Sequence, residues 1–379
     1  MKKVFLPLLL LCAGPLRPHE TLTTTVLFDR EIVRILDKHC VMCHAERGPA
    51  FPLETYDQTW LKKRDVHTHV IARHMPPWAA VPGYGQFVND NSLTLRETQF
   101  IVSWVEGLGP RDSGTVFLNV TGPDAARPPE VRAHADFGRW ELGEPDLTRP
   151  VPANTIDPQG STIKRSVVDL GLKSGRQLRA LEYMPGDTRV VRAAFFTVQE
   201  TGQWIGSWTP WYGATRLPKG AAFHLAAGSH VVAEIHYQGA KQPIVDRGSL
   251  GLFFSEAASS SPAPDLMLES RVPAPTSGPL QKFQAANRLV RDTQLLALRP
   301  EVSAGIKSVE VSARRPDGRT EVLLFAKDFP LEWPTPYIFK NPIAVPRGTE
   351  VSVTAYYANP TEVPRSGGIR LTISRIESR

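Results

Sequence analysis

Residues 231–237 read Val-Val-Ala-Glu-Ile-His-Tyr, and residues 189–198 read Arg-Val-Val-Arg-Ala-Ala-Phe-Phe-Thr-Val. Apolar and polar residues alternate over much of both stretches, which is typical of strands that bury one face. We predict strands at residues 166–172, 177–184, 189–198, 231–237, 248–254, 306–314, 321–325, 349–357 and 367–376. Many short strands joined by short Gly- or Pro-containing turns favour antiparallel sandwiches.

The composition agrees with a strand-rich chain. Pro accounts for 34 of 379 residues, about 9% against a usual ~5%, which favours turns over long helices. The chain is 41% hydrophobic and 22% charged, which excludes a disordered or fibrous protein. Its length suggests two or three domains. The net charge of +6 is small and scattered, so we expect no nucleic-acid partner.

The first residues predict an export signal. Two lysines at residues 2 and 3 precede an apolar run over residues 4–13. That run is about half the ~20 residues that cross a bilayer. We therefore expect a signal peptide at residues 1–18, a periplasmic or secreted protein and no transmembrane span. Lipoprotein anchoring through Cys12 is the alternative, although Leu11 before it is bulkier than such sites favour.

Residues 40–44 read Cys-Val-Met-Cys-His, which is the C-x-x-C-H attachment pattern of c-type haem. Two thiols at this spacing reach both vinyl groups of one porphyrin, and the adjacent imidazole meets the iron. A zinc site would need two more Cys or His ligands at short spacing, and no other Cys lies near this motif. A thioredoxin-type motif would need a βαβ context, whereas residues 28–38 predict an amphipathic helix. We predict covalent haem on Cys40 and Cys43, with His44 as an axial ligand.

A sixth iron ligand is expected further along the chain. Met75 lies within Arg-His-Met-Pro-Pro-Trp at residues 73–78. A thioether ligand raises the reduction potential of haem relative to two histidines. We predict Met75 as this ligand and Trp78 as a neighbour of the macrocycle edge. The histidines nearby are the alternatives: His67, His69 and His74.

Further motifs accompany this one: GPAFPL at residues 48–53, YGQF at 84–87 and IVSWVEG at 101–107. Over residues 25–112 the chain resembles the monohaem cytochrome c domain that is fused ahead of copper type II, ascorbate-dependent monooxygenase-like domains. These are of the peptidylglycine hydroxylating monooxygenase type. The resemblance implies that the methionine of the MPPW segment, Met75 here, is the axial ligand.

The resemblance continues into the β half through residues 190–194, 217–220, 234–237, 315–318 and 345–349. It implies a multidomain α + β protein, with an N-terminal all-α cytochrome c domain followed by two antiparallel, jelly-roll-like β-sandwiches. The expected boundaries are residues 25–112 for the cytochrome c domain, 113–158 for a Pro-rich linker, 159–258 for the first sandwich and 259–379 for the second.

The copper ligands of that family are largely missing from this sequence. The His-His pair of the family falls at Arg192 and Ala193, and its His-x-His motif falls within residues 299–305. No His follows His236, and no Met follows Met267. We therefore do not expect copper as a cofactor, and we name His236 as the candidate for a residual copper ligand. Otherwise we expect structural or surface roles for the histidines of this region: His224, His230 and His236.

The sequence thus predicts an exported c-type cytochrome that carries one electron to or from a redox partner protein, with the β scaffold as a docking or binding module. Enzymatic activity stays open. One alternative is a haem-fed, copper-dependent monooxygenase acting on paired donors with O2, against which the absent ligands count. Another is a non-redox module whose β half binds a small ligand. The aromatic residues that would line its pocket, or else pack in the core, are Trp204, Trp208, Trp211 and Tyr212.

Overall fold

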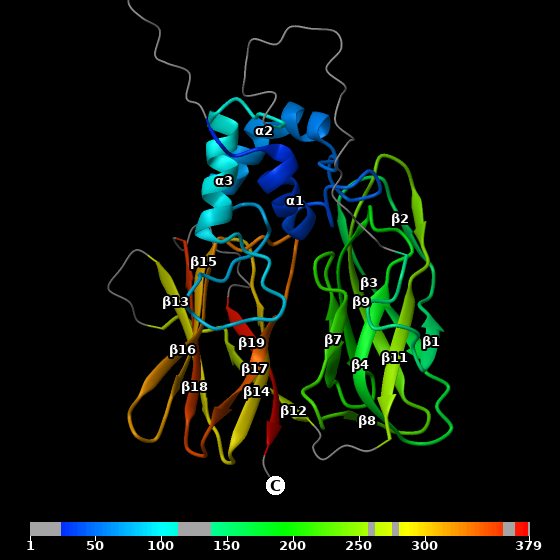
Figure 1. The fold of residues 1–379 in the computed structure, drawn as a ribbon. Coiled ribbons are helices and arrows are strands. Elements are labelled where there is room, and N and C mark those ends of the chain that lie inside the picture. The colour runs from blue at the N-terminus through cyan, green and yellow to red at the C-terminus, as the bar shows by residue number, and fades with distance from the viewer. Residues whose placement is uncertain (1–23, 113–137, 257–261, 275–279, 359–367, 378–379) are drawn as a thin grey trace, which may run out of the picture.

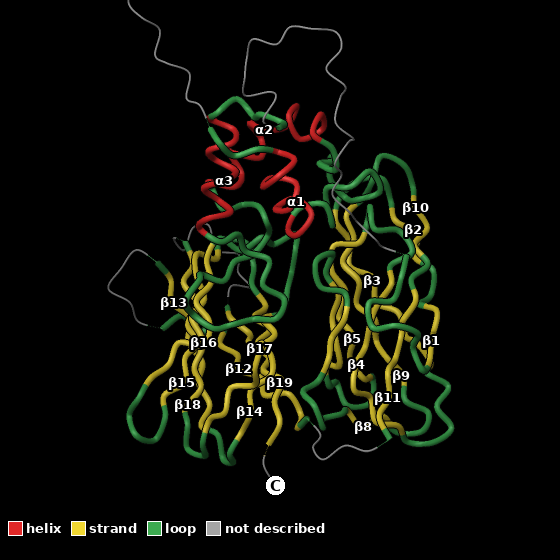
Figure 2. Tube along the Cα trace, viewed as in Figure 1, coloured by secondary structure: helices red, strands yellow, loops and turns green. Residues whose placement is uncertain are grey.

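The computed structural model describes residues 24–112, 138–256, 262–274, 280–358 and 368–377. Two β-sandwiches lie side by side, and the helices gather at one end of the pair (Figure 1). Figure 2 shows strands through most of the remaining chain. The predicted signal peptide at residues 1–18 and Cys12 lie outside the described residues.

The helices all come from the N-terminal part of the described chain. They are a short π-helix at Phe28–Ile32, α1 (Val33–His39), α2 (Tyr56–Ile71) and α3 (Leu95–Glu106). Capping boxes begin the two longer helices: Thr55 with Gln58 for α2, and Thr94 with Glu97 for α3. In each box two backbone N–H groups that the helix itself cannot pair are satisfied by side chains. The helices share one apolar cluster, which contains Phe28, Leu36, Ile101 and Trp104.

The first sandwich consists of two main antiparallel sheets. One sheet has the order β1 (Leu147–Pro150), β11 (Ser249–Ser255), β4 (Arg176–Met184) and β7 (Ala214–Arg216), with β8 (Phe223–Leu225) also paired to β4. The other has the order β3 (Ser161–Asp169), β9 (His230–Gln238), β5 (Val191–Val198) and β6 (Trp204–Trp208). A separate pair joins β2 (Asn154–Ile156) to β10 (Ile244–Asp246). The strands β1 and β2 fall within residues 113–158, where we expected a linker.

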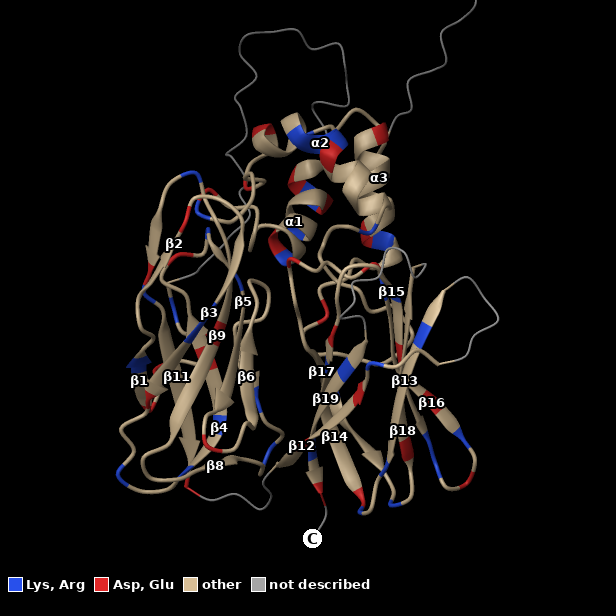
Figure 3. Ribbon diagram, turned by 180° about the vertical axis from the view of Figure 1, so that it is seen from behind, with Lys and Arg blue, Asp and Glu red and all other residues tan. Residues whose placement is uncertain are grey.

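The second sandwich repeats this architecture with two four-stranded antiparallel sheets. One has the order β12 (Ala263–Ser270), β19 (Ile369–Glu377), β14 (Thr293–Glu301) and β17 (Tyr337–Val345). The other has the order β13 (Gln281–Arg288), β18 (Glu350–Tyr357), β15 (Ile306–Arg314) and β16 (Thr320–Lys327). Lys and Arg are interspersed with Asp and Glu over both sandwiches and the helices (Figure 3).

The alternation of apolar and polar residues explains the central strands. In β9 and β18 every second residue is buried, because successive side chains of a strand point to opposite faces of the sheet. The strand β5 departs from this rule, since Val191–Ala194 are all buried. Both faces of β5 are therefore covered at this end of the strand. One of these residues, Arg192, lies over the ring of Trp333, which lines the cavity described below.

The expected fold class is wrong. The described residues are mostly β, with 44% of them in strands and 13% in helices, and the three α-helices among them do not form an independent all-α cytochrome c domain. The segment between α2 and α3 joins the second sandwich instead. Its Trp78, Ala79, Ala80 and Phe87 belong to the apolar core of that sandwich. The segment between α2 and α3 therefore shares the core of the second sandwich, whereas the helices keep a separate apolar cluster.

Backbone hydrogen bonds make the same connection. Val81 N–H donates to the carbonyl of Phe325 (2.8 Å), and Val88 N–H donates to that of Ile338 (2.8 Å). Isolated β-bridges join Ala80 to Ala326 and Phe87 to Phe339. None of the helices among the described residues is long and apolar enough to cross a membrane.

Candidate functional site

The Cys-x-x-Cys-His motif forms a tight turn directly after α1. The N–H groups of Cys43 and His44 both donate to the carbonyl of Cys40, at 3.0 and 2.9 Å. This turn brings both cysteines and the histidine to one cavity, and both thiols are free. Burial raises the pKa of each thiol to about 12, so both are protonated at neutral pH. A redox-active thiol instead has a lowered pKa, so these cysteines do not resemble a thioredoxin-type pair.

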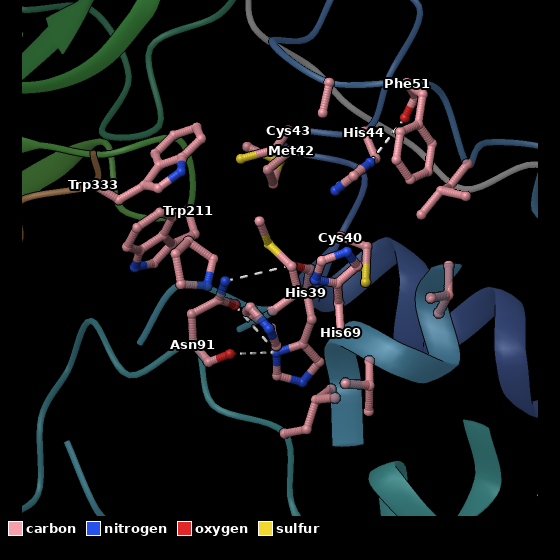
Figure 4. A pocket seen from close by; sticks show the side chains of 18 of the residues that line it. His39, Cys40, Met42, Cys43, His44, Phe51, His69, Asn91, Trp211 and Trp333 are labelled. Atoms are coloured by element: carbon pink, nitrogen blue, oxygen red, sulfur yellow. Dashed lines mark hydrogen bonds between the residues drawn. The ribbon is translucent and has the colours of Figure 1, made fainter. Parts of the chain in front are cut away.

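The cavity is mostly apolar and lies where the helices meet both sandwiches. Its volume is about 200 Å³, and the space continues into open solvent. Ligand pockets commonly measure about 300–1,000 Å³, so the enclosed part alone is smaller than these. Figure 4 shows Trp211 and Trp333 on one side of this cavity and Cys40 with His44 on the other. The site therefore presents two thiols and an imidazole to a mostly apolar cavity that opens to solvent.

A hydrogen bond to the backbone fixes the state of His44. Its Nδ1 lies 2.8 Å from the carbonyl oxygen of Phe51, and because a carbonyl only accepts, Nδ1 carries the proton. Burial lowers the pKa of His44, so the ring is neutral and Nε2 keeps its lone pair. Figure 4 shows this second nitrogen pointing into the cavity. A neutral imidazole held in this way is the form that ligates metals.

Two of the four candidates for a second axial ligand line the cavity: Met75 and His69. His67 does not line it, and its Nε2 lies 3.1 Å from Glu106 Oε1. His74 is exposed, with its ring centroid 5.8 Å from that of His69. Met75 and His69 thus both line the cavity, and Met75 as the axial ligand stays a prediction with His69 as the histidine alternative.

Several cavity residues were missed by the sequence analysis. Trp333 comes from the second sandwich, and His39 lies one residue before the motif. The Nδ1 atom of His39 lies 3.1 Å from Asn91 Oδ1, and its Nε2 lies 3.2 Å from Glu97 Oε1. Both nitrogens of this buried ring therefore have partners in the surrounding chain. No spacing pattern links these residues along the sequence, because only the tertiary fold brings them to the cavity.

The predicted aromatic residues divide between the cavity and the core. Among Trp204, Trp208, Trp211 and Tyr212, only Trp211 lines the cavity. Its indole N–H donates to the carbonyl of Asn89 (3.2 Å). The expectation for Trp78 is wrong, because its ring packs 5.2 Å from that of Tyr337 in the second sandwich and does not line the cavity.

The structure does not bring the histidines of the first sandwich together. The Nε2 atom of His236 lies 3.0 Å from Glu234 Oε1, and the Nδ1 atom of His230 lies 2.9 Å from Glu200 Oε1. His224 is exposed. The described residues contain no group of three or more His, Cys, Asp or Glu that could hold a metal ion. A metal site made of three or more such side chains is therefore absent from the described residues. The expectation of metal binding is wrong in this respect, and so is that of a residual copper site at His236.

Comparisons with known proteins identify no family. No protein-family model matches the chain, and no curated protein matches it. Among solved structures, the major capsid protein P2 of bacteriophage PM2 is similar at 10% identity and a TM-score of 0.27, over 61% of this chain and 98% of that one. An archaeal virus protein with a triple jelly-roll fold has 11% identity and a TM-score of 0.22, over 59% of each chain. Allantoicase has 9% identity and a TM-score of 0.20, over 56% of this chain and 77% of that one. At these scores the likenesses carry no argument about function.

Proposed function

We propose that this protein carries one electron by means of a haem attached covalently to Cys40 and Cys43, with His44 as an axial ligand. The observation that carries the proposal is the state of His44: its Nδ1–H donates to Phe51, and Nε2 faces a cavity that both thiols line. A haem needs only one or two ligands from the protein, since the porphyrin supplies the others. The absence of a three-residue metal group among the described residues concerns a different kind of site.

The residues of the cavity fit such a group. Two protonated thiols can each add across one vinyl group, which forms a C–S bond and leaves the thiol hydrogen on the neighbouring carbon, so no oxidant is needed. Covalently bound haem would supply a one-electron couple at its iron. The chain's own contribution is to orient the imidazole through Phe51, to offer Met75 or His69 on the cavity wall, and to exclude water with apolar side chains.

The two tryptophans give the β half a role in this proposal. Trp211 belongs to the first sandwich and Trp333 to the second, and both close the same side of the cavity. The sandwiches therefore act as part of the cofactor's enclosure, and the electron passes between this cavity and a redox partner protein. We include export in the proposal, on the basis of the signal pattern at residues 1–18.

The cavity also favours a second candidate function. Its wall is mostly apolar, and the two tryptophans from the β half provide flat surfaces for an aromatic or apolar ligand. In this alternative the ligand binds without a covalent bond, and the cysteines remain thiols. The two candidate functions differ in whether the bound group stays attached to the polypeptide when the protein is denatured.

The test is production of the full chain in a bacterial host that attaches haem to exported proteins. After denaturing electrophoresis, we expect haem peroxidase activity to migrate with the protein. The double variant Cys40→Ala/Cys43→Ala should lose this signal, whereas Cys12→Ala, which changes the remaining cysteine, should keep it. Wild-type protein that is free of haem and has two titratable thiols would overturn the proposal and favour the non-covalent alternative.

A further inference from the structure

Arg192 lies at an irregularity of β5 that faces the helical segment. In the pairing of β5 with β9, Val191 is opposite Tyr237 and Ala193 is opposite His236, so Arg192 is the extra residue of a β-bulge. Bulges redirect a side chain and are common beside functional sites. This bulge explains why a charged residue near the start of a largely buried strand does not simply point to solvent.

The guanidinium of Arg192 is buried, although none of the ion pairs of the described residues includes it. Only 8% of the residue is exposed. Its Nη1 donates to the carbonyl of Arg189 (3.2 Å), and its Cζ lies 4.7 Å from the centroid of the Trp333 ring, over the face of a tryptophan that lines the cavity. Among the described residues, no carboxylate forms an ion pair with it. Burying a charge without an ion-pair partner is costly, so such a residue is a candidate for a functional role.

The charge lies behind one wall of the cavity. The guanidinium lies over the ring face of Trp333, and Trp333 lines the cavity together with both cysteines and His44. Glu332, next to Trp333 in the chain, is exposed to solvent. Charges in water are screened far more than buried ones. The positive charge of Arg192 therefore remains largely uncompensated on the Trp333 side of the cavity.

We propose that Arg192 is a positioning residue that holds a fixed positive charge behind the Trp333 wall of the cavity and thereby increases the electron affinity of the haem bound there. The inference rests on the proposed function. Reduction adds one negative charge to the site, and a nearby cation in a medium of low dielectric constant favours the reduced state. Trp333 holds the guanidinium in place through its ring face.

The experiment is a spectroelectrochemical titration of the haem-loaded full chain. Arg192→Met keeps the apolar stem and removes the charge, and we expect the equilibrium constant for reduction to fall at least tenfold, which is about 59 mV for a one-electron couple. Arg192→Lys keeps a positive charge, so its equilibrium constant for reduction should stay close to that of the wild type. The matched control is Arg189→Met, three residues earlier, because Arg189 is exposed and paired with Asp187.

Each outcome decides the question. A fall of less than tenfold in the equilibrium constant for reduction of Arg192→Met would overturn the inference. If that variant fails to fold, Arg192→Gln replaces it, with the same expectation. If neither neutral variant takes up haem while the wild type does, Arg192 is a structural residue and the inference is wrong. Wild-type protein without any haem absorption would instead contradict the proposed function itself.

Discussion

Replacing Asn89 by Ala tests how the helical segment is joined to the two sandwiches. The buried Asn89 side chain donates from Nδ2 to the carbonyl of Pro336 (2.6 Å) and accepts at Oδ1 from the N–H of Ile338 (3.1 Å). Its own carbonyl accepts from the indole of Trp211 (3.2 Å). One residue of the N-terminal part thus contacts both sandwiches, directly beside the cavity.

The expected loss can be estimated from these contacts. In Asn89→Ala, the buried Ile338 N–H loses its partner, at about 1–3 kcal/mol, whereas the Pro336 carbonyl keeps a hydrogen bond from the Thr335 hydroxyl. The expected cost is therefore about 2 kcal/mol. Since about 1.4 kcal/mol corresponds to a factor of ten, local opening should become about thirtyfold more frequent.

Hydrogen exchange at the N–H of Val88 measures this opening. That group donates to the Ile338 carbonyl, a bond that the substitution leaves in place, so faster exchange reports separation of the two segments. Asn341→Ala, at an exposed asparagine of the same strand as Ile338, is the matched control and should leave the exchange unchanged. Wild-type protection of Val88 in Asn89→Ala would refute the reasoning.

Three further predictions address the acid stability, the axial ligand and the core. Burial opposes ionisation of Glu97, but hydrogen bonds from Thr94 and Lys38 outweigh it and lower the pKa of Glu97 from 4.5 to about 2. The ionised Glu97 therefore stabilises the folded state fully above pH 4.5, and this contribution is lost as the pH falls towards 2. Glu97→Gln should accordingly flatten the pH dependence of the free energy of unfolding between pH 4.5 and 2. In the haem-loaded protein, Met75→Ala should abolish the long-wavelength sulfur-to-iron band of the ferric spectrum and His69→Ala should not; persistence of the band in the first variant would exclude Met75 as ligand. Leu295→Ala removes a fully buried side chain from the core of the second sandwich and should cost about 2–5 kcal/mol in urea unfolding, and a loss below ~1 kcal/mol would contradict its assigned packing.

Local patterns in the sequence indicate the strands well but not their partners. The alternation in residues 231–237 and 349–357 corresponds to β9 and β18, because a half-buried strand carries its burial pattern in its own residues. The expected all-α domain is wrong for a complementary reason. Ala80 and Phe87 pair with Ala326 and Phe339, more than two hundred residues away, and no local pattern reveals such contacts.

The cavity shows the same division. The turn that follows α1 brings Cys40, Cys43 and His44 together, and their short spacing made this grouping predictable. Trp333 enters the cavity from a distant loop, and Arg192 approaches it through a bulge, so neither could be assigned there from spacing. Sequence reasoning identifies chemical groups that are adjacent in the chain, whereas the surroundings that set their properties come from the fold.

The most direct test of the account is the intact mass of the full chain after production in a host that attaches haem to exported proteins. The account predicts a species heavier than the processed polypeptide by one haem, which persists under denaturing conditions and disappears in Cys40→Ala/Cys43→Ala. A wild-type mass equal to that of the polypeptide alone, with Cys40 and Cys43 both open to alkylation, would contradict it.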